Sequence, residues 1–342
     1  MRAHISQIDY HLPEAVLDNS ELAAVFGDWS AEKIADKTGI SQRRIAAKGE
    51  CASDLAFAAA DKLLTSAAIE RSAVDFLLLC TQSPDYFLPT TACLLQSRLG
   101  LSTKCGALDF NLGCSGYVYG LGLAKGLIES GQARNVLLLT GETYSKYIHP
   151  GDRSVRTLFG DAGSATLVQG RQSSEESIGP FIYGTDGAGA ENLIVSGGAH
   201  RHVCAASNSD EGAEGSTPGP ANLYMNGAEI FSFTLKSVPA AVNAILQKSG
   251  LAIDHIDLFV FHQANEFMLK HLRNKIGIPE DKFVVAMKDV GNTVSATIPI
   301  ALKESVESGR LKEGMTVLLV GFGVGYSWGA NILKWSSQRS SQ

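Results

Sequence analysis

The chain has 342 residues, enough for about two domains, and 45% of them are apolar, so general disorder is excluded. With 29 basic and 35 acidic residues, the net charge of −6 argues against a nucleic-acid-binding surface spread over the whole protein. No apolar run approaches the roughly 20 residues of a membrane-spanning helix, and residues 1–13 lack the long apolar stretch of an export signal. We therefore expect neither nucleic acid nor membrane as a partner.

The cysteines indicate reduced thiols. They form no C-x-x-C pair, and a chain of this length needs no disulfide bonds to fold, so we expect a cytoplasmic protein. The pattern H-x-H-x-C at residues 200–204 has no fourth ligand nearby, and we expect no metal site there. The six cysteines are Cys51, Cys80, Cys93, Cys105, Cys114 and Cys204.

Short apolar runs alternate with longer stretches rich in Ala, Leu and Gly. The runs predict buried strands, and the stretches between them predict helices at residues 53–68, capped by Ser53, and at residues 115–129. This alternation indicates an α/β fold with a sheet covered on both faces. The expected strands span residues 74–80, 107–112, 136–140 and 165–168.

The second half of the chain repeats features of the first. Residues 68–82 and residues 251–263 each contain a polar helix end, an Asp, a buried strand and a Gln. Asp75 and Asp257 are 182 positions apart, and a second pair of similar strands is 181 apart. Buried strands can look alike by chance, but the shared offset predicts duplication of one α/β unit. The predicted halves are residues 1–172 and residues 173–342.

Residues 196–222 are rich in Gly, Ser, Ala and Pro and predict a long surface loop. Such a loop is either a cover over a substrate entrance or a mobile connection, and the sequence does not choose between them. Residues 336–342 are expected to be frayed.

Cys114 differs in context from the other cysteines. It follows an apolar strand, lies in N-L-G-C-S-G and precedes a predicted helix. Unpaired N–H groups and the helix dipole at such a position favour the nucleophilic thiolate. The alternative for any cysteine is a small buried apolar residue, which suits Cys80 and Cys93. We predict that Cys114 is a nucleophile.

Two polar residues of the second half are candidate partners for this nucleophile. His262 follows a predicted strand in F-H-Q-A-N, where α/β proteins tend to place functional groups, although a lone His is more often structural. Asn292, in G-N-T-V-S-A-T, is either a helix cap or an amide donor aimed at a carbonyl oxygen. The glycine-rich segment 321–329 could supply a backbone N–H to an oxyanion hole. The spaced glycines at 184, 187 and 189 are too weak a pattern for a phosphate loop.

Seven segments, in order, resemble the β-ketoacyl-[acyl carrier protein] synthase III family of the thiolase superfamily. The resemblance extends over nearly the whole chain and implies a thiolase-like fold of two duplicated α/β halves in a layered αβαβα arrangement. The segments are K-T-G-I-S-Q-R-R-I (37–45), N-L-G-C-S-G-Y (111–117), D-R-S-V-R-T-L-F-G-D-A-G-S-A (152–165), M-N-G-A-E-I-F (225–231), F-H-Q-A-N (261–265), G-N-T-V-S-A (291–296) and G-F-G-V-G-Y-S-W-G (321–329).

The resemblance implies a catalytic triad of Cys114, His262 and Asn292 and a reaction in two stages. Cys114 takes an acyl group from acyl-CoA, with the backbone N–H groups of Cys114 and Val324 as the oxyanion hole. Malonyl-[acyl carrier protein] then loses CO₂, and the carbanion attacks the acyl-enzyme to give a 3-oxoacyl-carrier product. His262 and Asn292 stabilise the enolate. No cofactor is implied, because the CoA thioester is a substrate.

The resemblance also implies contacts to the substrates, and departures from the family pattern occur among them. The family often has a Trp where this chain has Lys33, but Trp29 lies one helical turn earlier. In place of a docking Arg the chain has Phe267. The implied CoA and substrate contacts are Trp29, Lys37, Arg153, Gly227, Phe231 and Asn265. The implied acyl-pocket residues are Leu88 and Leu158, and the implied carrier-docking residues are Lys270, Arg273 and Lys275. These three charges are otherwise an ordinary solvated face.

A homodimer is implied by resemblance, since a partner subunit usually contributes the residue at position 88. Two alternatives to condensation remain. One is an acyltransferase that moves the acyl group from Cys114 to a hydroxyl or amine; retention of Asn292 argues against it, because simple transfer needs no enolate donor. The other is a non-catalytic subunit of a heterodimeric synthase, against which the complete triad argues.

Overall fold

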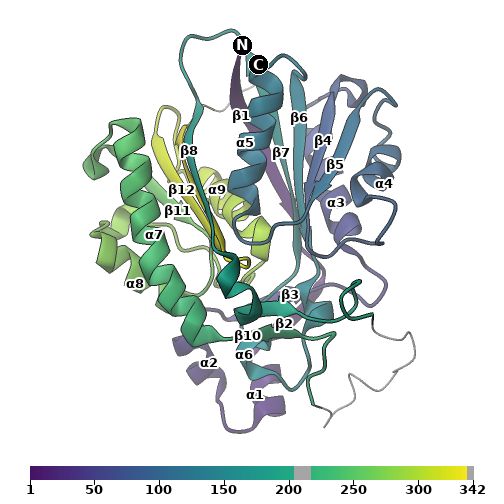
Figure 1. The fold of residues 1–342 in the computed structure, drawn as a ribbon, viewed down its shortest axis with the longest axis vertical. Coiled ribbons are helices and arrows are strands. Elements are labelled where there is room, and N and C mark those ends of the chain that lie inside the picture. The colour runs from purple at the N-terminus through teal and green to yellow at the C-terminus, as the bar shows by residue number, and fades with distance from the viewer. Residues whose placement is uncertain (204–216, 337–342) are drawn as a thin grey trace.

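The structure is a computed structural model that describes residues 1–203 and 217–336. Its core has five layers, in which two β-sheets alternate with three layers of helices (Figure 1). The predicted α/β class and the αβαβα arrangement are therefore confirmed. Each sheet takes all its strands from one side of the predicted boundary at residues 172 and 173.

The first sheet has five strands in the order β1-β7-β6-β4-β5. Strand β4 runs parallel to its neighbours β5 and β6, while β7 pairs antiparallel with both β6 and β1. The apolar runs F-L-L-L-C and V-L-L-L-T fill β4 and β6, as expected for strands buried on both faces. The strands are β1 (Arg2–His11), β4 (Phe76–Cys80), β5 (Gly106–Phe110), β6 (Asn135–Glu142) and β7 (Ala162–Arg171).

The second sheet repeats this arrangement in four strands, ordered β11-β12-β13-β8. A parallel bridge between Phe259 and Phe283 occupies the place that β5 has in the first sheet. Asp75 accepts hydrogen bonds from the N–H groups of Arg134 and Asn135 at the start of β6, and Asp257 accepts one from Thr316 at the start of β12. The two halves are therefore duplicates. The strands are β8 (Ile178–Thr185), β11 (Leu258–Phe261), β12 (Thr316–Gly323) and β13 (Ser327–Lys334).

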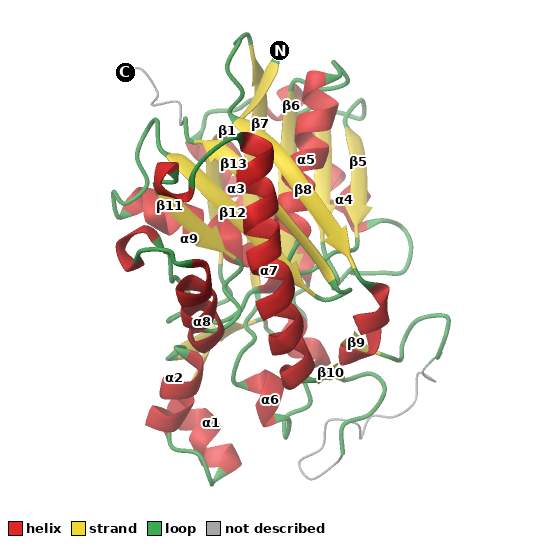
Figure 2. Cartoon of the chain, turned by 60° about the vertical axis from the view of Figure 1, so that its left-hand side comes forward, coloured by secondary structure: helices red, strands yellow, loops and turns green. Residues whose placement is uncertain are grey.

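Helices fill the middle layer and cover both outer faces. Helices α5 and α9 contact both sheets and share an apolar core with them. Helices α3 and α4 cover the first sheet, and α7 and α8 cover the second (Figure 2). The helices are α3 (Ala52–Ser66), α4 (Thr91–Arg98), α5 (Gly116–Glu129), α7 (Gly227–Ser249), α8 (Glu266–Ile276) and α9 (Thr297–Glu307).

Helix α3 begins earlier than expected. Cys51, not Ser53, occupies the cap position, and the Asp54 carboxylate accepts a hydrogen bond from the Cys51 N–H at 2.7 Å. Ser53 is buried inside the first turn. The helix begins at Ala52 because Asp54, three positions after the cap, accepts the hydrogen bond from the cap N–H. The search for a Ser cap alone does not detect this signal.

Small elements lie below the two sheets in Figure 1, at the end where β4, β6 and β11 finish. They contact one another, as α1 does α2, β2 does β3 and α6 does β10, and α2 also contacts α8. These elements are α1 (Asn19–Phe26), α2 (Ala31–Thr38), β2 (Ala15–Asp18), β3 (Gln42–Ile45), α6 (Arg153–Arg156), β9 (Leu193–Val195) and β10 (Leu223–Met225).

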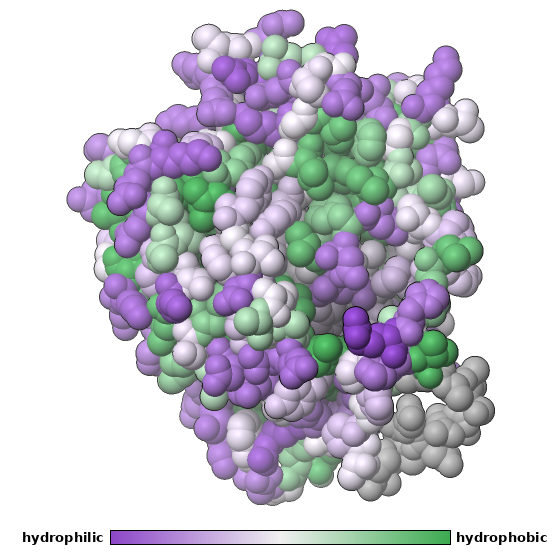
Figure 3. Space-filling model, in the orientation of Figure 1, coloured by the Kyte–Doolittle hydropathy of each residue, from purple (hydrophilic) through white to green (hydrophobic). Residues whose placement is uncertain are grey.

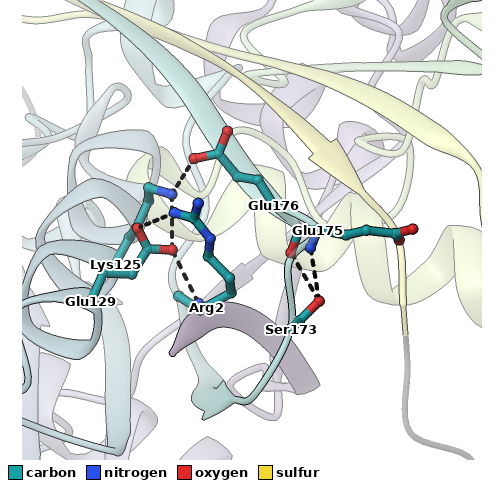
Figure 4. A network of polar contacts seen from close by, with 7 residues as sticks. Arg2, Lys125, Glu129, Ser173, Glu175 and Glu176 are labelled. Atoms are coloured by element: carbon teal, nitrogen blue, oxygen red, sulfur yellow. Dashed lines mark hydrogen bonds and ion pairs between the residues drawn. The ribbon is translucent and has the colours of Figure 1, made fainter.

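A polar network ties the connection between the halves to the first half (Figure 4). Lys125 of α5 pairs with Glu176 in the connection and with Glu129 at 3.1 Å, and Glu129 also pairs with Arg2 at 3.3 Å. Ion pairs that are partly exposed in this way add little to stability. Their consequence is geometric, because they hold the start of β8 beside β1.

Within the described ranges, no helix is both long and apolar enough to cross a membrane. The same residues contain no group of three His, Cys, Asp or Glu side chains that could hold a metal ion. Residues 204–216, including Cys204 of the H-x-H-x-C pattern and the middle part of the predicted loop, lie outside the described residues, as do residues 337–342.

Candidate active site

Cys114 lies where the first half meets the last strands of the second. It is buried two residues before α5, at the turn that follows β5. The end of β12 packs on it so closely that a Cβ at Gly323 would lie 2.9 Å from its sulfur. A Cβ at Gly321 would lie 2.8 Å from its carbonyl oxygen. The glycines of segment 321–329 therefore allow β12 to approach the nucleophile.

The thiol of Cys114 is protonated at rest, contrary to the thiolate expected from its place before a helix. Burial, with a smaller contribution from the nearby Glu142, raises its pKa to about 12. Hydrogen bonds from the backbone of Val324 and of Cys114 itself act in the opposite direction. These two groups are the predicted oxyanion hole. Ser327 donates to the Val324 carbonyl at 3.2 Å and contacts Ser115 at 2.5 Å, which fixes this turn beside Cys114.

His262 directly follows β11 and is buried. Its N–H donates to the Val320 carbonyl at 2.8 Å, and its Nδ1 lies 2.7 Å from the hydroxyl of Thr297, which in turn lies 3.0 Å from the Val294 carbonyl. Burial lowers the pKa of His262 to about 3, so the ring is neutral near pH 7. The Thr297 hydroxyl donates either to the Val294 carbonyl or to Nδ1 of His262. In the first case Nδ1 carries the ring proton and Nε2 accepts; in the second case Nε2 carries the proton and donates.

Asn292 is held by both its backbone and its side chain. Its N–H donates to the Leu158 carbonyl at 2.9 Å, and its own carbonyl accepts from Gly160 at 3.0 Å. Its Oδ1 accepts from the Val294 N–H at 3.0 Å, which leaves the Nδ2 donor as the free end of the amide. Asn292 is not the cap of α9, because that position is Ala296. The geometry favours the amide-donor interpretation.

A set of shared neighbours brings the three predicted catalytic residues together. The Val294 N–H binds the Asn292 side chain, and the Val294 carbonyl binds Thr297, which in turn contacts His262. The Cγ1 of Val294 also lies 3.2 Å from where a Cβ of Gly113, the neighbour of Cys114, would be. The ring of Phe322 contacts His262 edge-on, with 5.5 Å between ring centres, and the next residue of β12 contacts Cys114. The site therefore forms where the two halves meet.

A cavity of about 570 Å³ opens beside this site and contains four residues predicted to contact substrate. Trp29, Lys37, Arg153 and Leu158 all line it. The ring of Trp29 lies 4.6 Å from the Arg153 guanidinium and 5.2 Å from the Lys37 ammonium. The carbonyl of Leu158, one of the lining residues, accepts the hydrogen bond from the Asn292 N–H, so one wall of the cavity adjoins Asn292.

The other predicted substrate contacts do not line this cavity. Gly227 begins α7 and faces open space, and Asn265 caps α8 by accepting from the Met268 N–H at 2.8 Å. Phe231 packs against Phe267, with 5.7 Å between ring centres. Leu88, predicted for the acyl pocket, is 82% exposed in the loop after β4 and is not among the residues that line the cavity with Leu158. Their substrate roles stay predictions.

The predicted docking charges are partly neutralised within the chain. Lys270 pairs with Glu266 at 2.7 Å, and Arg273 pairs with Glu280 at 2.7 Å. Lys275 is exposed on the same helix. Beside them Phe267 is 53% exposed. The docking role of these cations stays a prediction.

Glu142, at the end of β6, was not identified from the sequence. It is completely buried near Cys114, and burial raises its pKa to about 8, although hydrogen bonds from Ser295, Gln82 and Ser83 oppose that shift. A single acidic residue after an apolar strand resembles an ordinary solvated strand end. Only the contact across the two halves reveals it.

Comparisons with known proteins agree over the whole chain. The family model described as "3-Oxoacyl-[acyl-carrier-protein (ACP)] synthase III" matches residues 108–187, and its C-terminal counterpart matches residues 246–335. A beta-ketoacyl-[acyl-carrier-protein] synthase III 2 of Halalkalibacterium halodurans is 37% identical and aligns over 98% of this chain and 97% of that protein. A beta-ketoacyl-[acyl-carrier-protein] synthase III of Caldanaerobacter subterraneus is 34% identical, over 95% and 96% of the two chains.

Solved structures show the same similarity. A crystal structure of a 3-oxoacyl-(acyl-carrier-protein) synthase III superposes with a TM-score of 0.94 at 55% identity and covers 98% of this chain and 100% of that one. The 3-oxoacyl-(acyl-carrier protein) synthase of Burkholderia xenovorans LB400 gives 0.89 at 40% identity, with coverages of 97% and 94%. The chain belongs to the 3-oxoacyl-[acyl-carrier-protein] synthase III family of the thiolase superfamily and is a condensing acyltransferase.

Proposed function

We propose that the protein catalyses a decarboxylating Claisen condensation of an acyl-CoA with malonyl-[acyl carrier protein]. The products are 3-oxoacyl-[acyl carrier protein], CoA and CO₂. The observation that carries the proposal is the convergence of a buried Cys114, a neutral His262 and the Nδ2 donor of Asn292 at one end of β12. Family membership supports the same reaction.

The first half-reaction acylates Cys114. The thiol proton leaves to a base, for which neutral His262 is the candidate, and the sulfur attacks the thioester carbonyl of acyl-CoA. The N–H groups of Cys114 and Val324 stabilise the tetrahedral oxyanion. The bond from carbon to the CoA sulfur then breaks, and the CoA thiolate takes up a proton. Trp29, Lys37 and Arg153 are the proposed CoA contacts, because they line the cavity beside the site.

The second half-reaction forms the carbon–carbon bond. Malonyl thioester loses CO₂, and the electron pair of the broken bond moves into an enolate. The Asn292 Nδ2 and an N–H at the His262 Nε2 stabilise its oxygen without needing a positive charge. The enolate carbon attacks the acyl carbonyl, the bond to Cys114 breaks, and the thiolate is reprotonated. No cofactor takes part, since loss of CO₂ generates the carbanion.

Acyl transfer to a hydroxyl or amine is not favoured. Such a transfer forms no enolate, so it needs no donor of the kind that Asn292 presents. In this structure the Asn292 backbone and Oδ1 are both occupied, and only the Nδ2 donor is free to meet a substrate. This arrangement supports condensation.

We also infer a homodimer. Among the described residues, strand β5 is a sheet edge that pairs with β4 alone, and an edge of this kind can pair with a further strand. Apolar side chains gather over α5 and this edge (Figure 3), among them Leu108 at 45% and Leu123 at 44% exposure. Phe87 and Leu88 are also exposed, at 79% and 82%. A second copy on this face would cover them and would allow Leu88 to reach a partner's acyl pocket.

A cytoplasmic location remains an inference from the cysteine spacing. The proposed carrier-docking residues Lys270, Arg273 and Lys275 lie on one helix, and a weakly acidic overall charge makes such a local patch necessary for an acidic carrier.

The test separates the two half-reactions. The protein is incubated with a panel of acyl-CoAs, its intact mass is measured, and malonyl-[acyl carrier protein] is then added while CO₂ and the 3-oxoacyl product are measured. We expect an acyl adduct on the wild type and none on Cys114→Ala. Acylation with no CO₂ and no 3-oxoacyl product would refute the condensation.

A further inference from the structure

Glu142 has no part in the reaction described above, although it lies near the nucleophile. It is completely buried, and its three hydrogen-bond partners are uncharged. The Gln82 N–H lies 3.1 Å and the Ser83 hydroxyl 3.2 Å from one carboxylate oxygen, and the Ser295 hydroxyl lies 2.8 Å from the other. Burying a carboxyl group without a cation is costly, so these contacts need a specific explanation.

One of these contacts joins the two halves of the molecule. Gln82 and Ser83 follow β4, and Glu142 ends β6, so they all belong to the first half. Ser295 belongs to the second half and lies in the short 3₁₀ helix η6 (Val294–Ala296). The bond between Ser295 and Glu142 therefore attaches η6 to the sheet of the first half, next to the segment that carries Cys114.

The helix η6 holds both enolate-stabilising residues. The Val294 N–H binds the Oδ1 of Asn292 at 3.0 Å, and the Val294 carbonyl accepts from Thr297 at 3.0 Å. Thr297 in turn contacts the Nδ1 of His262 at 2.7 Å. A displacement of η6 would therefore turn the Asn292 amide directly and would affect His262 only through Thr297.

The backbone of η6 needs support from outside. Val294 has a φ of 54°, in the left-handed region that a β-branched residue rarely adopts. A conformation of this kind costs on the order of 1–3 kcal/mol and persists only where the surroundings impose it. The next residue, Ser295, supplies such a restraint through its bond to Glu142.

We propose that Glu142 is a positioning residue which, through Ser295, holds η6 so that Asn292 faces the substrate of the condensation step. This inference rests on the proposed function. Cys114 is positioned by α5 and by the glycines of β12, and η6 reaches the proposed acylation base His262 only through Thr297, so acylation depends less on η6 than decarboxylation does. Decarboxylation depends on the Asn292 donor and is the step that the Glu142–Ser295 contact supports.

The chain offers a matched pair of variants. Ser295→Ala and Ser83→Ala each remove one hydroxyl donor from the same carboxylate, but only Ser295 carries the link to the second half. Ser305→Ala is a further control, because its buried hydroxyl bonds only the Ala301 carbonyl of its own helix. The acylation rate, and kcat and KM for CO₂ release from malonyl-[acyl carrier protein], are measured for the acylated enzymes.

We expect Ser295→Ala to lower kcat for CO₂ release by about 10- to 100-fold, the scale of a misplaced catalytic group, with KM and acylation within about threefold. Ser83→Ala should affect both half-reactions equally and weakly, and Ser305→Ala neither. Equal losses in both half-reactions for Ser295→Ala, or the same split for Ser83→Ala, would overturn the proposal.

A second variant guards against a folding defect. Glu142→Gln keeps the volume, but above pH 8, where Glu142 is ionised, it places an NH₂ donor where the wild type presents only acceptors, so at that pH it should show the same split as Ser295→Ala. An unchanged rate of CO₂ release in folded Glu142→Gln would also overturn the positioning role. If wild-type enzyme acylates but releases no CO₂, the proposed function itself fails, and this inference fails with it.

Discussion

The two halves share one frame but place different chemistry at equivalent points. Helices α5 and α9 begin 181 positions apart, at Gly116 and Thr297, and the residues two positions before them are Cys114 and Ser295. The first half therefore places a nucleophile before its central helix, where the second half places a hydroxyl that binds Glu142.

The strand ends differ in the same way. The last residue of β4 is Cys80, whose thiol is buried with a pKa raised well above its usual value, mainly by that burial. The residue after β11 is His262, a neutral imidazole. Duplication brings two strand ends and two helix starts to one place, and divergence gives each half its own chemical role. In the proposed reaction, the first half forms the acyl-enzyme and the second half stabilises the enolate.

The largest effect should follow from replacing the nucleophile. Cys114→Ala should abolish acylation, a loss on the order of 10⁶-fold as for other enzymes that lose a nucleophile. Cys80→Ala, at the corresponding strand end of the same half, should acylate within about threefold of wild type. Intact-mass spectrometry measures both. Acylation of Cys114→Ala would remove the proposed distinction between the two cysteines.

Asn292→Ala tests the enolate-stabilising role of the second half. It should retain acylation but lose about 100- to 1,000-fold in the rate of CO₂ release, the usual cost of one oxyanion donor. Asn226→Ala is the control, since Asn226 only caps α7 and its loss should cost about 1 kcal/mol of stability. If both half-reactions fell equally in Asn292→Ala, the division between the halves would be wrong.

The pH dependence of stability should separate a buried group in each half. Glu142 has a pKa of about 8 in the folded protein against an ordinary 4.5, so its contribution to stability is lost as pH rises from 4.5 to 8. His262 has a pKa of about 3 against an ordinary 6.5, so its contribution is lost as pH falls from 6.5 to 3.

These windows overlap between pH 4.5 and 6.5 and are separate outside it. From pH 6.5 to pH 8, the unfolding free energy should fall by roughly 2 kcal/mol less in Glu142→Gln than in the wild type. As pH falls from 4.5 to 3, the unfolding free energy should decrease less in His262→Gln than in the wild type, by a similar amount. Urea unfolding at the ends of each window measures this. A variant that left the slope of its own window unchanged would refute the assigned shift.

Gly323→Ala should disturb the contact between the halves more mildly. The added Cβ would lie 2.8 Å from the Cβ and 2.9 Å from the sulfur of Cys114, so we expect a loss of about 1–3 kcal/mol in stability and slower acylation. Gly187→Ala, where no atom lies within 4 Å, is the control and should be nearly neutral. Thermal unfolding and acylation rates of both variants show whether β12 must approach Cys114 this closely.

Trp29→Ala should have the smallest effect. All the residues that line the cavity beside the site belong to the first half, and Trp29 is one of them, so Trp29→Ala should raise KM for acyl-CoA by about tenfold. Phe231→Ala, in the second half, should change KM less, because Phe231 packs on Phe267 and does not line that cavity. The opposite order would move the CoA contacts to the second half.

The sequence predicted the frame and pointed to three residues that the structure brings to one place, because both depend on local signals. Apolar runs set the strands, the offset between Asp75 and Asp257 revealed the duplication, and motifs located Cys114, His262 and Asn292. The protonation of Cys114 was mispredicted, because burial and Glu142, both tertiary effects, outweigh the position before α5. Glu142 itself was missed, since its partner Ser295 is 153 positions away.

The predicted substrate contacts also depend on tertiary structure that local sequence signals do not reveal. Trp29 and Arg153 are 124 positions apart in sequence, and only the family pattern linked them before the structure placed them 4.6 Å apart. The docking cations looked free in the sequence, but Lys270 and Arg273 are paired with Glu266 and Glu280. Pairing of charges depends on side-chain geometry that residue order does not contain.

The buried, protonated state of Cys114 has a consequence for selective chemistry. A thiol with a pKa of about 12 is a poor target for peroxide and for general alkylating reagents, which attack thiolates. Exposed Cys93, in contrast, meets such reagents first. A covalent inhibitor of this enzyme should therefore owe its selectivity to binding in the cavity beside Trp29 and Arg153. Its reactive group should react with the Cys114 sulfur only after the active site has removed the thiol proton.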